Sequence, residues 1–177
     1  MLNRRHIRVK VMQSIYAMGC TMQNSLPQEE KFVKESIKES YSLYLLMLDL
    51  MVEVHAFAKA HQEKHSKKIL ATEIEKNPNT KFIENQALVK MASNTMLQDE
   101  LEKRKLKNWR LDDEYVAIIF NAMVESSAYE AYMDAGETTF KEDRAFVVQF
   151  YTEVLAPNDK LYDYLEANYF SLVFFST

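Results

Sequence analysis

The stretch YSLYLLMLDLMVEVHAFA, residues 41–58, decides the fold because it is the most apolar part of the chain. Through it and just before it, apolar residues recur at heptad-like intervals, at Ile37, Tyr41, Tyr44, Leu48 and Met51. Asp49, Glu53 and His55 interrupt the apolar run, which argues against a membrane span. We therefore predict a long second helix over residues 28–66, in the core of a soluble protein.

The rest of the composition also favours helices. Only two of the 177 residues are glycine and three are proline, so residues that form turns are scarce. Apolar spacing predicts a first helix over residues 3–21 and later ones over 81–93 and 97–105, after a break at NPNT (77–80). Asp112 or Asp113, Ser126 or Ser127, and Thr139 are suited to begin further helices, the last of these running to Leu155. We predict an all-α helical bundle of about seven to eight helices.

No repeat or glycine-serine linker divides the chain, so we expect a single helical body over residues 1–177. It would consist of an N-terminal helix at 1–22, a helical region at 28–167 and an atypical tail at 168–177. The tail ends in FSLVFFST, which is apolar and uncharged, whereas chain ends are usually polar. Either these residues pack into the body, or the chain stops before the element that would cover them.

Charge is distributed unevenly along the chain. Residues 1–28 carry four bases and no acid, whereas the remaining residues carry 18 bases and 26 acids, a charge of −8. An acidic body repels a polyanion and a basic end attracts one, so such a partner would bind at the N-terminal end. A single cysteine, Cys20, excludes an internal disulfide framework, and we expect a cytoplasmic protein.

Motifs for enzymatic chemistry are weak. In HQEKH, residues 61–65, two histidines stand four apart, but the glutamate is out of register with the zincin motif and a third ligand is not evident. Cys20 stands in an apolar helical context that favours packing. We expect no catalysis, no metal and no cofactor.

The aromatic residues have two interpretations, as core packing residues or as platforms for stacking bases. Most of the tyrosines and phenylalanines recur at helical core spacing, which favours packing. Trp109 differs because five bases surround it in KRKLKNWR, residues 103–110. That segment is either a solvated connection, which we favour, or a second part of the basic N-terminal surface.

The basic residues of the first helix stand in a particular geometry. Ile7, Val11 and Ile15 share one face with Met18 and Met22, and His6, Lys10, Gln13 and Ser14 fall on an opposite polar strip. Arg4 and Arg8 continue the apolar face, so the first two turns should either project beyond the body or stay unwound. Cations at a helix start are disfavoured by about 0.3–1 kcal/mol each, and a bound phosphate chain would reverse this.

Residues 3–17, NRRHIRVKVMQSIYA, resemble the first helix of the NusB family of transcription antitermination factors. An arginine-rich start there runs into a Gln-x-Leu-Tyr-like pattern, matched by Gln13, Ile15 and Tyr16. NPNTKFIENQ, LEKRKLKNWRLDDEYVAIIFN and FKEDRAFVVQFYTEVLAPNDKLYDYLE resemble segments of a long helical insertion in the extended NusB proteins of the Bacteroidetes group. The resemblance covers residues 3–167, so that 28–167 would be the insertion region.

The resemblance implies an RNA-binding role without catalysis. The protein would bind the boxA element of ribosomal RNA transcripts together with the ribosomal protein NusE, as part of the transcription elongation complex. The family's RNA-contacting part carries over to Arg4, Arg5, His6 and Arg8. Lys10 and Gln13 extend this predicted site because they share the polar strip with His6. The alternative is a helical protein-interaction module whose basic N-terminus docks on an acidic partner or a membrane surface.

One departure from the family concerns the C-terminal half. The family continues into further helices with an Asn-Glu signature and a closing Phe-x-Asn-Gly-x-Leu-Asp pattern, and neither is present here. The resemblance therefore predicts a truncated or frameshifted chain with exposed apolar surface. Self-association through that surface is a further expectation.

Overall fold

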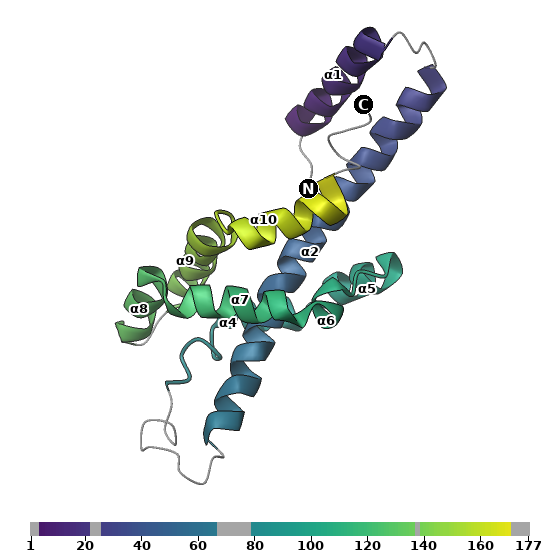
Figure 1. Ribbon diagram of the computed structural model, residues 1–177. Helices are drawn as coiled ribbons and strands as arrows, with labels where there is room; N and C mark the ends of the chain where they lie inside the picture. The colour runs from purple at the N-terminus through teal and green to yellow at the C-terminus, as the bar shows by residue number, and fades with distance from the viewer. Residues whose placement is uncertain (1–3, 22–25, 67–78, 137–138, 171–177) are drawn as a thin grey trace. The chain divides into compact units, whose positions relative to one another are not determined.

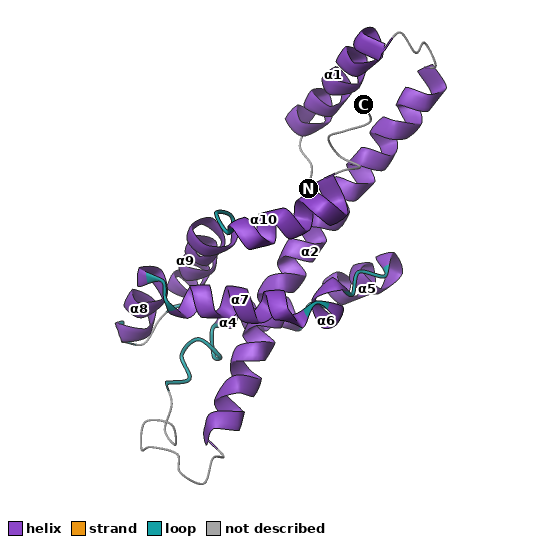
Figure 2. Ribbon diagram, viewed as in Figure 1, coloured by secondary structure: helices purple, strands orange, loops and turns teal. Residues whose placement is uncertain are grey.

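The computed structural model describes residues 4–21, 26–66, 79–136 and 139–170 (Figure 1). Every regular element in these ranges is a helix, as Figure 2 shows, so the predicted all-α class is confirmed. The α-helices are α1 (Arg4–Thr21), α2 (Leu26–Ser66), α4 (Gln86–Ala92), α5 (Thr95–Arg104), α6 (Asn108–Leu111), α7 (Asp113–Val124), α8 (Ser127–Asp134), α9 (Phe140–Phe150) and α10 (Asp159–Leu165). Two π-helical segments, η1 (Tyr151–Leu155) and η2 (Glu166–Phe170), follow α9 and α10.

Residue contacts divide the chain into two compact units. Unit 1 comprises residues 1–45 and 163–177, and unit 2 comprises residues 46–162. The helix α2 belongs to both, because its first half lies in unit 1 and its second half in unit 2. The single helical body over residues 1–177 stays a prediction.

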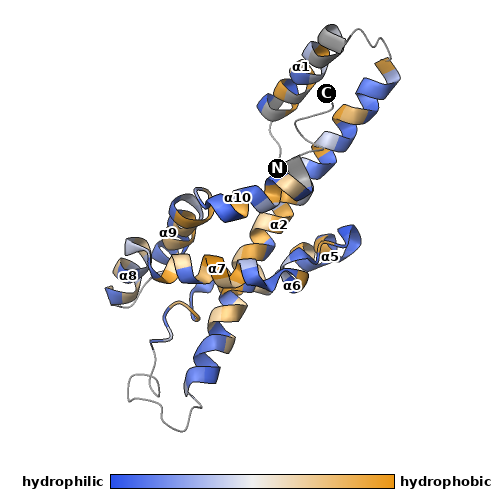
Figure 3. Ribbon diagram, in the orientation of Figure 1, coloured by the Kyte–Doolittle hydropathy of each residue, from blue (hydrophilic) through white to orange (hydrophobic). Residues whose placement is uncertain are grey.

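Helix α2 is the predicted long second helix, 41 residues in length. Figure 3 shows its apolar residues concentrated in its middle, with hydrophilic residues toward both ends. Leu46, Leu50 and Val54, spaced four apart, are fully buried there. Glu29 in the first turn and Lys64 in the last turn complement the helix dipole.

Length and composition alone would allow α2 to cross a membrane. However, 50% of its most apolar 18-residue window is buried inside the protein, and the core helix of a soluble protein passes the same test. The apolar stretch of α2, residues 41–58, also contains the two carboxylates of Asp49 and Glu53, which are unfavourable in a membrane. The expectation that α2 is not a membrane span stays a prediction.

The core of unit 2 is rich in aromatic side chains. Tyr132 on α8 and Phe146 on α9 stack with ring centroids 4.1 Å apart, and Phe150 continues the stack. Phe82, which is 2% exposed, meets Phe146 edge-on. Edge-on and offset ring pairs add stability beyond their buried area, so these contacts fix how α8 and α9 pack. The aromatic residues at core spacing are thus mainly packing residues in this unit.

A buried polar network joins α4, α8 and α9 at this core. Asn85 caps α4, since its Oδ1 accepts hydrogen bonds from the amides of Ala87 and Leu88. Its Nδ2 donates to the hydroxyl of Tyr132 at 3.0 Å and to the carbonyl of Asp143 at 3.3 Å. The Asp143 carboxylate in turn accepts from the Tyr132 hydroxyl at 2.7 Å and from the Gln86 amide at 2.9 Å. Each polar group therefore has partners, as burial requires.

Several predicted helix boundaries are confirmed and others are wrong. Ser126 and Thr139 cap α8 and α9 as predicted, the latter through a capping box with Glu142. The helix predicted from residue 81 begins only at residue 86, because residues 81–84 form a turn and Asn85 takes the cap position. Asp112 stands before α7, but its side chain makes no capping hydrogen bond.

Other differences concern elements that periodicity did not predict. The four-residue helix α6 is too short to show a period. The helix predicted to end at Leu155 does end there, but its last turn is the π-helical η1, which stops before Pro157. Asn79 and Thr80 lie outside any helix, in line with the predicted break, while residues 77–78 and the tail from residue 171 lie outside the described residues.

Candidate nucleic-acid interface

The six predicted RNA-binding residues all lie on α1, in unit 1. The helix begins with two arginines and has neither an acidic residue in its first turn nor a basic residue in its last. This charge order is the reverse of the one that the helix dipole favours. The side chains of Arg5, Arg8 and Gln13 are exposed, and those of Arg4, His6 and Lys10 lie outside the described part of the structure.

The exposed face of α1 can be identified from the burial of single residues. Ser14 is 4% exposed, so its position marks the inward side of the helix. Arg5 lies nine residues before Ser14, which places it about 180° away at 100° per residue. Met12 and Tyr16 fall within about 20° of Arg5 on the same wheel and are 73% and 75% exposed. A strip of Arg5, Arg8, Met12 and Tyr16 therefore faces outward.

This orientation corrects the predicted inward face of α1. Ile7, Val11 and Ile15 were expected to pack, yet they are 38%, 40% and 59% exposed. Ser14, expected on the polar strip, is buried instead, and its hydroxyl has no hydrogen-bond partner in the described structure. Ser14 stands seven residues after Ile7, which places the two about 20° apart at 100° per residue, so Ser14 lies on the side of Ile7 and not on the opposite strip. The structure does not describe the side chains of Met18 and Met22, which were expected on the same face.

Neither Arg5 nor Arg8 has an ion-pair partner among the residues that the structure describes. The charges of Arg5 and Arg8 are therefore not neutralised by any described carboxylate. A guanidinium in this state can form bidentate hydrogen bonds to phosphate. The strip thus combines two exposed cations that have no ion-pair partner among the described residues with an exposed tyrosine and an exposed methionine on one face.

The second basic segment, residues 103–110, is different. Trp109 is 1% exposed and its indole Nε1 donates to the carbonyl of Leu46 at 2.8 Å, so it is a core residue of unit 2 and no stacking platform. Lys103 and Arg104 pair with Glu100, and Arg110 pairs with Glu53 at 3.3 Å. These pairs account for three of the five bases, which supports the solvated connection that the sequence favoured.

The histidines of HQEKH are likewise placed by packing. His61 and His65 stack with ring centroids 4.2 Å apart, and His61 also contacts Phe120. Among the described residues no group of three metal-ligating side chains comes together. His55, six residues upstream of His61, is buried, and its Nε2 lies 2.8 Å from the Ile83 carbonyl.

The buried carboxyl of Asp49 has a raised pKa that the sequence did not predict. Asp49 on α2 is 9% exposed, and burial together with the charge of Glu53 raises the pKa of its carboxyl to about 6, with Arg110 opposing that rise. Periodicity alone could not identify it, because the sequence does not show which side of α2 is covered at this turn. Asp49 lies in unit 2, whereas the predicted RNA-binding residues lie on α1 in unit 1, so we assign the raised pKa of Asp49 to the core of unit 2 and not to the candidate interface.

Comparison of the chain with known protein families, with curated proteins and with solved structures found no match.

Proposed function

We propose that the protein is an RNA-binding transcription antitermination factor of NusB type, which binds boxA-like RNA together with NusE and catalyses no reaction. The observation that carries the proposal is the start of α1, where Arg5 and Arg8 are exposed and have no described ionic partner. The resemblance of residues 3–17 to the family's first helix supplies the identity of the RNA. Arg4, Arg5, His6 and Arg8 would contact RNA, with Lys10 and Gln13 beside them.

Electrostatics supports an anionic ligand at this end. The first 28 residues carry a net charge of +4, while the residues after position 28 carry a net charge of −8. Phosphate contacts would offset the cost of about 0.3–1 kcal/mol for each cation near a helix start. The acidic remainder of the chain would repel the rest of the polyanion and so confine its binding to α1.

A second candidate function is favoured by the exposed apolar side chains of α1. Met12, Ile15 and Tyr16 are 73%, 59% and 75% exposed beside the arginines, an arrangement that also fits an acidic protein or an anionic membrane surface. Under this alternative the protein is a non-enzymatic helical interaction module. Specific binding to boxA-like RNA separates it from the first candidate.

The test compares two RNAs and two variants. A fluorescently labelled boxA-like RNA and a scrambled RNA of the same composition are titrated with the full chain at several salt concentrations. The variant Arg4→Ala/Arg5→Ala/Arg8→Ala should lose binding, while Lys103→Ala/Lys107→Ala/Lys141→Ala, which removes the same charge from unit 2, should retain it. Vesicles with and without phosphatidylserine test the alternative. Equal binding of both RNAs, or binding to anionic vesicles alone, would favour the interaction module.

A further inference from the structure

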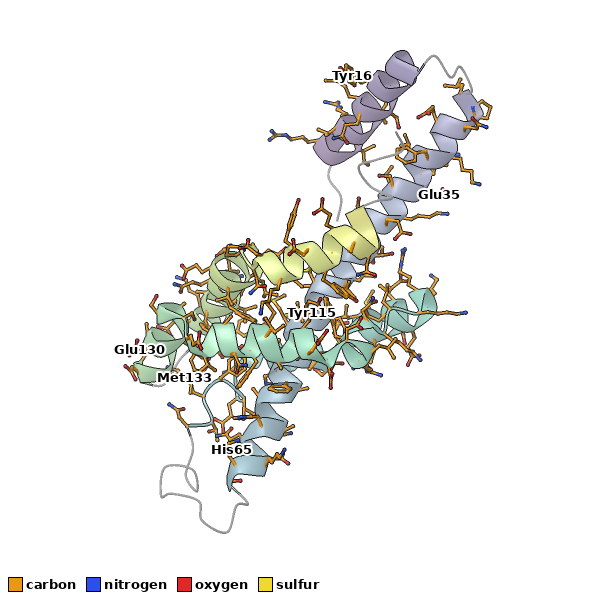
Figure 4. The ribbon with its side chains drawn as sticks, viewed as in Figure 1. Tyr16, Glu35, His65, Tyr115, Glu130 and Met133 are labelled. Atoms are coloured by element: carbon orange, nitrogen blue, oxygen red, sulfur yellow. The ribbon has the colours of Figure 1, made fainter. Side chains whose placement is uncertain are left out.

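A cavity in unit 2 lies between the end of α2, the turn at residues 79–85, α7 and α8, and has a volume of about 360 Å³. Each of the three helices contributes residues four apart: His61 and His65, Phe120 and Val124, and Tyr129 and Met133. Residues with this spacing lie one above the other on a helix face, so each helix presents one continuous wall. Figure 4 labels His65 and Met133, which stand on two of these walls. The volume falls in the range of about 300–1,000 Å³ that small-molecule sites occupy.

The walls of the cavity are joined to one another by hydrogen bonds. The side-chain amide of Gln62 on α2 donates to the Asn79 carbonyl at 3.3 Å, and the side-chain amide of Asn79 donates to the Met133 carbonyl at 3.2 Å. Lys81 adds further bonds to carbonyls at the end of α8. These bonds hold α2, the turn and α8 at fixed separation, so a ligand would enter a site that already exists, which lowers the cost of binding.

The chemistry of the lining is asymmetric. Aromatic and apolar side chains cover most of it, including Phe120, Tyr129 and Met133, which suit the faces of a planar ring. The polar side chains lie on α2 and in the turn, and include the two imidazoles and the Gln62 amide, all of which can donate hydrogen bonds. The lining, every residue of which belongs to the described part of the chain, contains no carboxylate.

We propose that this cavity binds a planar aromatic carboxylic acid of one or two fused rings. The ring lies against Phe120, Tyr129 and Met133, and the carboxylate accepts hydrogen bonds from His61, His65 and Gln62. A cationic ligand of the same shape meets donors where it needs acceptors and binds more weakly. This site is separate from α1 and does not depend on RNA binding.

The probe is indole-3-acetate, titrated into the full chain and followed by amide chemical shifts in ¹⁵N NMR spectra. Tryptamine, which carries an ammonium on the same ring, and 3-methylindole, which carries no charge, are the matched comparison ligands. We expect saturable binding of indole-3-acetate with a Kd below about 1 mM, and at least about tenfold weaker binding of the other two. The shifts should be largest for the backbone of α7 and α8 around Phe120 and Met133.

Two variants locate the site. Val124→Trp fills the cavity from its 43% exposed edge and should weaken binding at least about tenfold, whereas Val148→Trp, at a 58% exposed position on α9, should leave it unchanged. His61→Phe/His65→Phe keeps the rings and removes the donors, and should abolish the preference over 3-methylindole. Absence of saturation, equal binding of tryptamine, or equal weakening by both tryptophan variants would overturn the proposal.

Discussion

Replacing the buried carboxyl of Asp49 by an amide should make the protein more stable at neutral pH. Asp49 is 9% exposed on α2, and burial and the nearby Glu53 carboxylate raise its pKa from 3.8 to about 6. A carboxyl whose pKa is higher in the folded state binds its proton more tightly there than in the unfolded chain. Its contribution to stability is therefore fully present below pH 4 and is lost as the pH rises through 6.

The size of this loss follows from the pKa values. The shift from 3.8 to about 6 corresponds to about 3 kcal/mol, at about 1.4 kcal/mol for each unit. Asp49→Asn keeps the shape of the side chain and cannot ionise. The variant should therefore gain about 3 kcal/mol relative to the parent between pH 4 and pH 8, with most of the gain between pH 4 and pH 6.

The assay is urea unfolding followed by circular dichroism, for parent and variant at a series of pH values from 4 to 8. Differences between the two proteins cancel the titration of all other groups that the substitution leaves alone. Asp99→Asn, which removes an exposed carboxyl from α5, is the matched control for the loss of one carboxylate. The reasoning is refuted if the Asp49→Asn difference is the same at pH 4 and pH 8, or if the variant loses stability as the pH rises.

Three further predictions concern packing and hydrogen bonding. Asn85→Ala should lower the free energy of unfolding by about 2–3 kcal/mol, because it removes a helix cap and two buried hydrogen bonds. The control Asn94→Ala, at the exposed cap of α5, should lower it by about 1 kcal/mol, and equal losses of the two variants in urea unfolding would contradict this prediction. Trp109, the single tryptophan, should emit at short wavelength and resist acrylamide quenching until the protein unfolds, and strong quenching of the native protein would disprove its burial. Ser14→Ala should leave stability unchanged or raise it by up to about 1 kcal/mol, because the buried hydroxyl has no described partner, and a clear loss in thermal unfolding would reveal one.

The helical class and most helix boundaries could be predicted from the sequence because both depend on local signals. The apolar spacing through residues 41–58 predicted α2, and Ser126 and Thr139 predicted the starts of α8 and α9. The late start of α4 could not be predicted, because Asn85 is drawn into the cap position by its long-range bonds to Tyr132 and Asp143. Hydrogen bonds between residues so far apart in the sequence do not affect the periodicity of the apolar residues from which helices are predicted.

The exposed side of α1 could not be predicted from the sequence. The sequence placed the cations at the start of α1, and the structure shows that Arg5 shares its exposed side with Met12 and Tyr16. Met12 and Tyr16 stand seven and eleven residues after Arg5, a spacing that places all three on one side of a helix. The apolar periodicity instead favoured the row of Ile7, Val11 and Ile15 as the covered side. Which side of a helix is covered depends on the elements that pack against it, and the sequence of the helix alone does not specify them.

The most direct test of the proposed function is the salt-dependent affinity of the full chain for boxA-like RNA, measured by fluorescence anisotropy beside the scrambled RNA. The proposal predicts tighter binding of the boxA-like RNA and an affinity that falls with salt. In the Arg4→Ala/Arg5→Ala/Arg8→Ala variant binding should be abolished, or, if any remains, log K should fall with log salt by about 2 less for three lost single-strand phosphate contacts. Equal affinity of the parent and this variant for boxA-like RNA would contradict it.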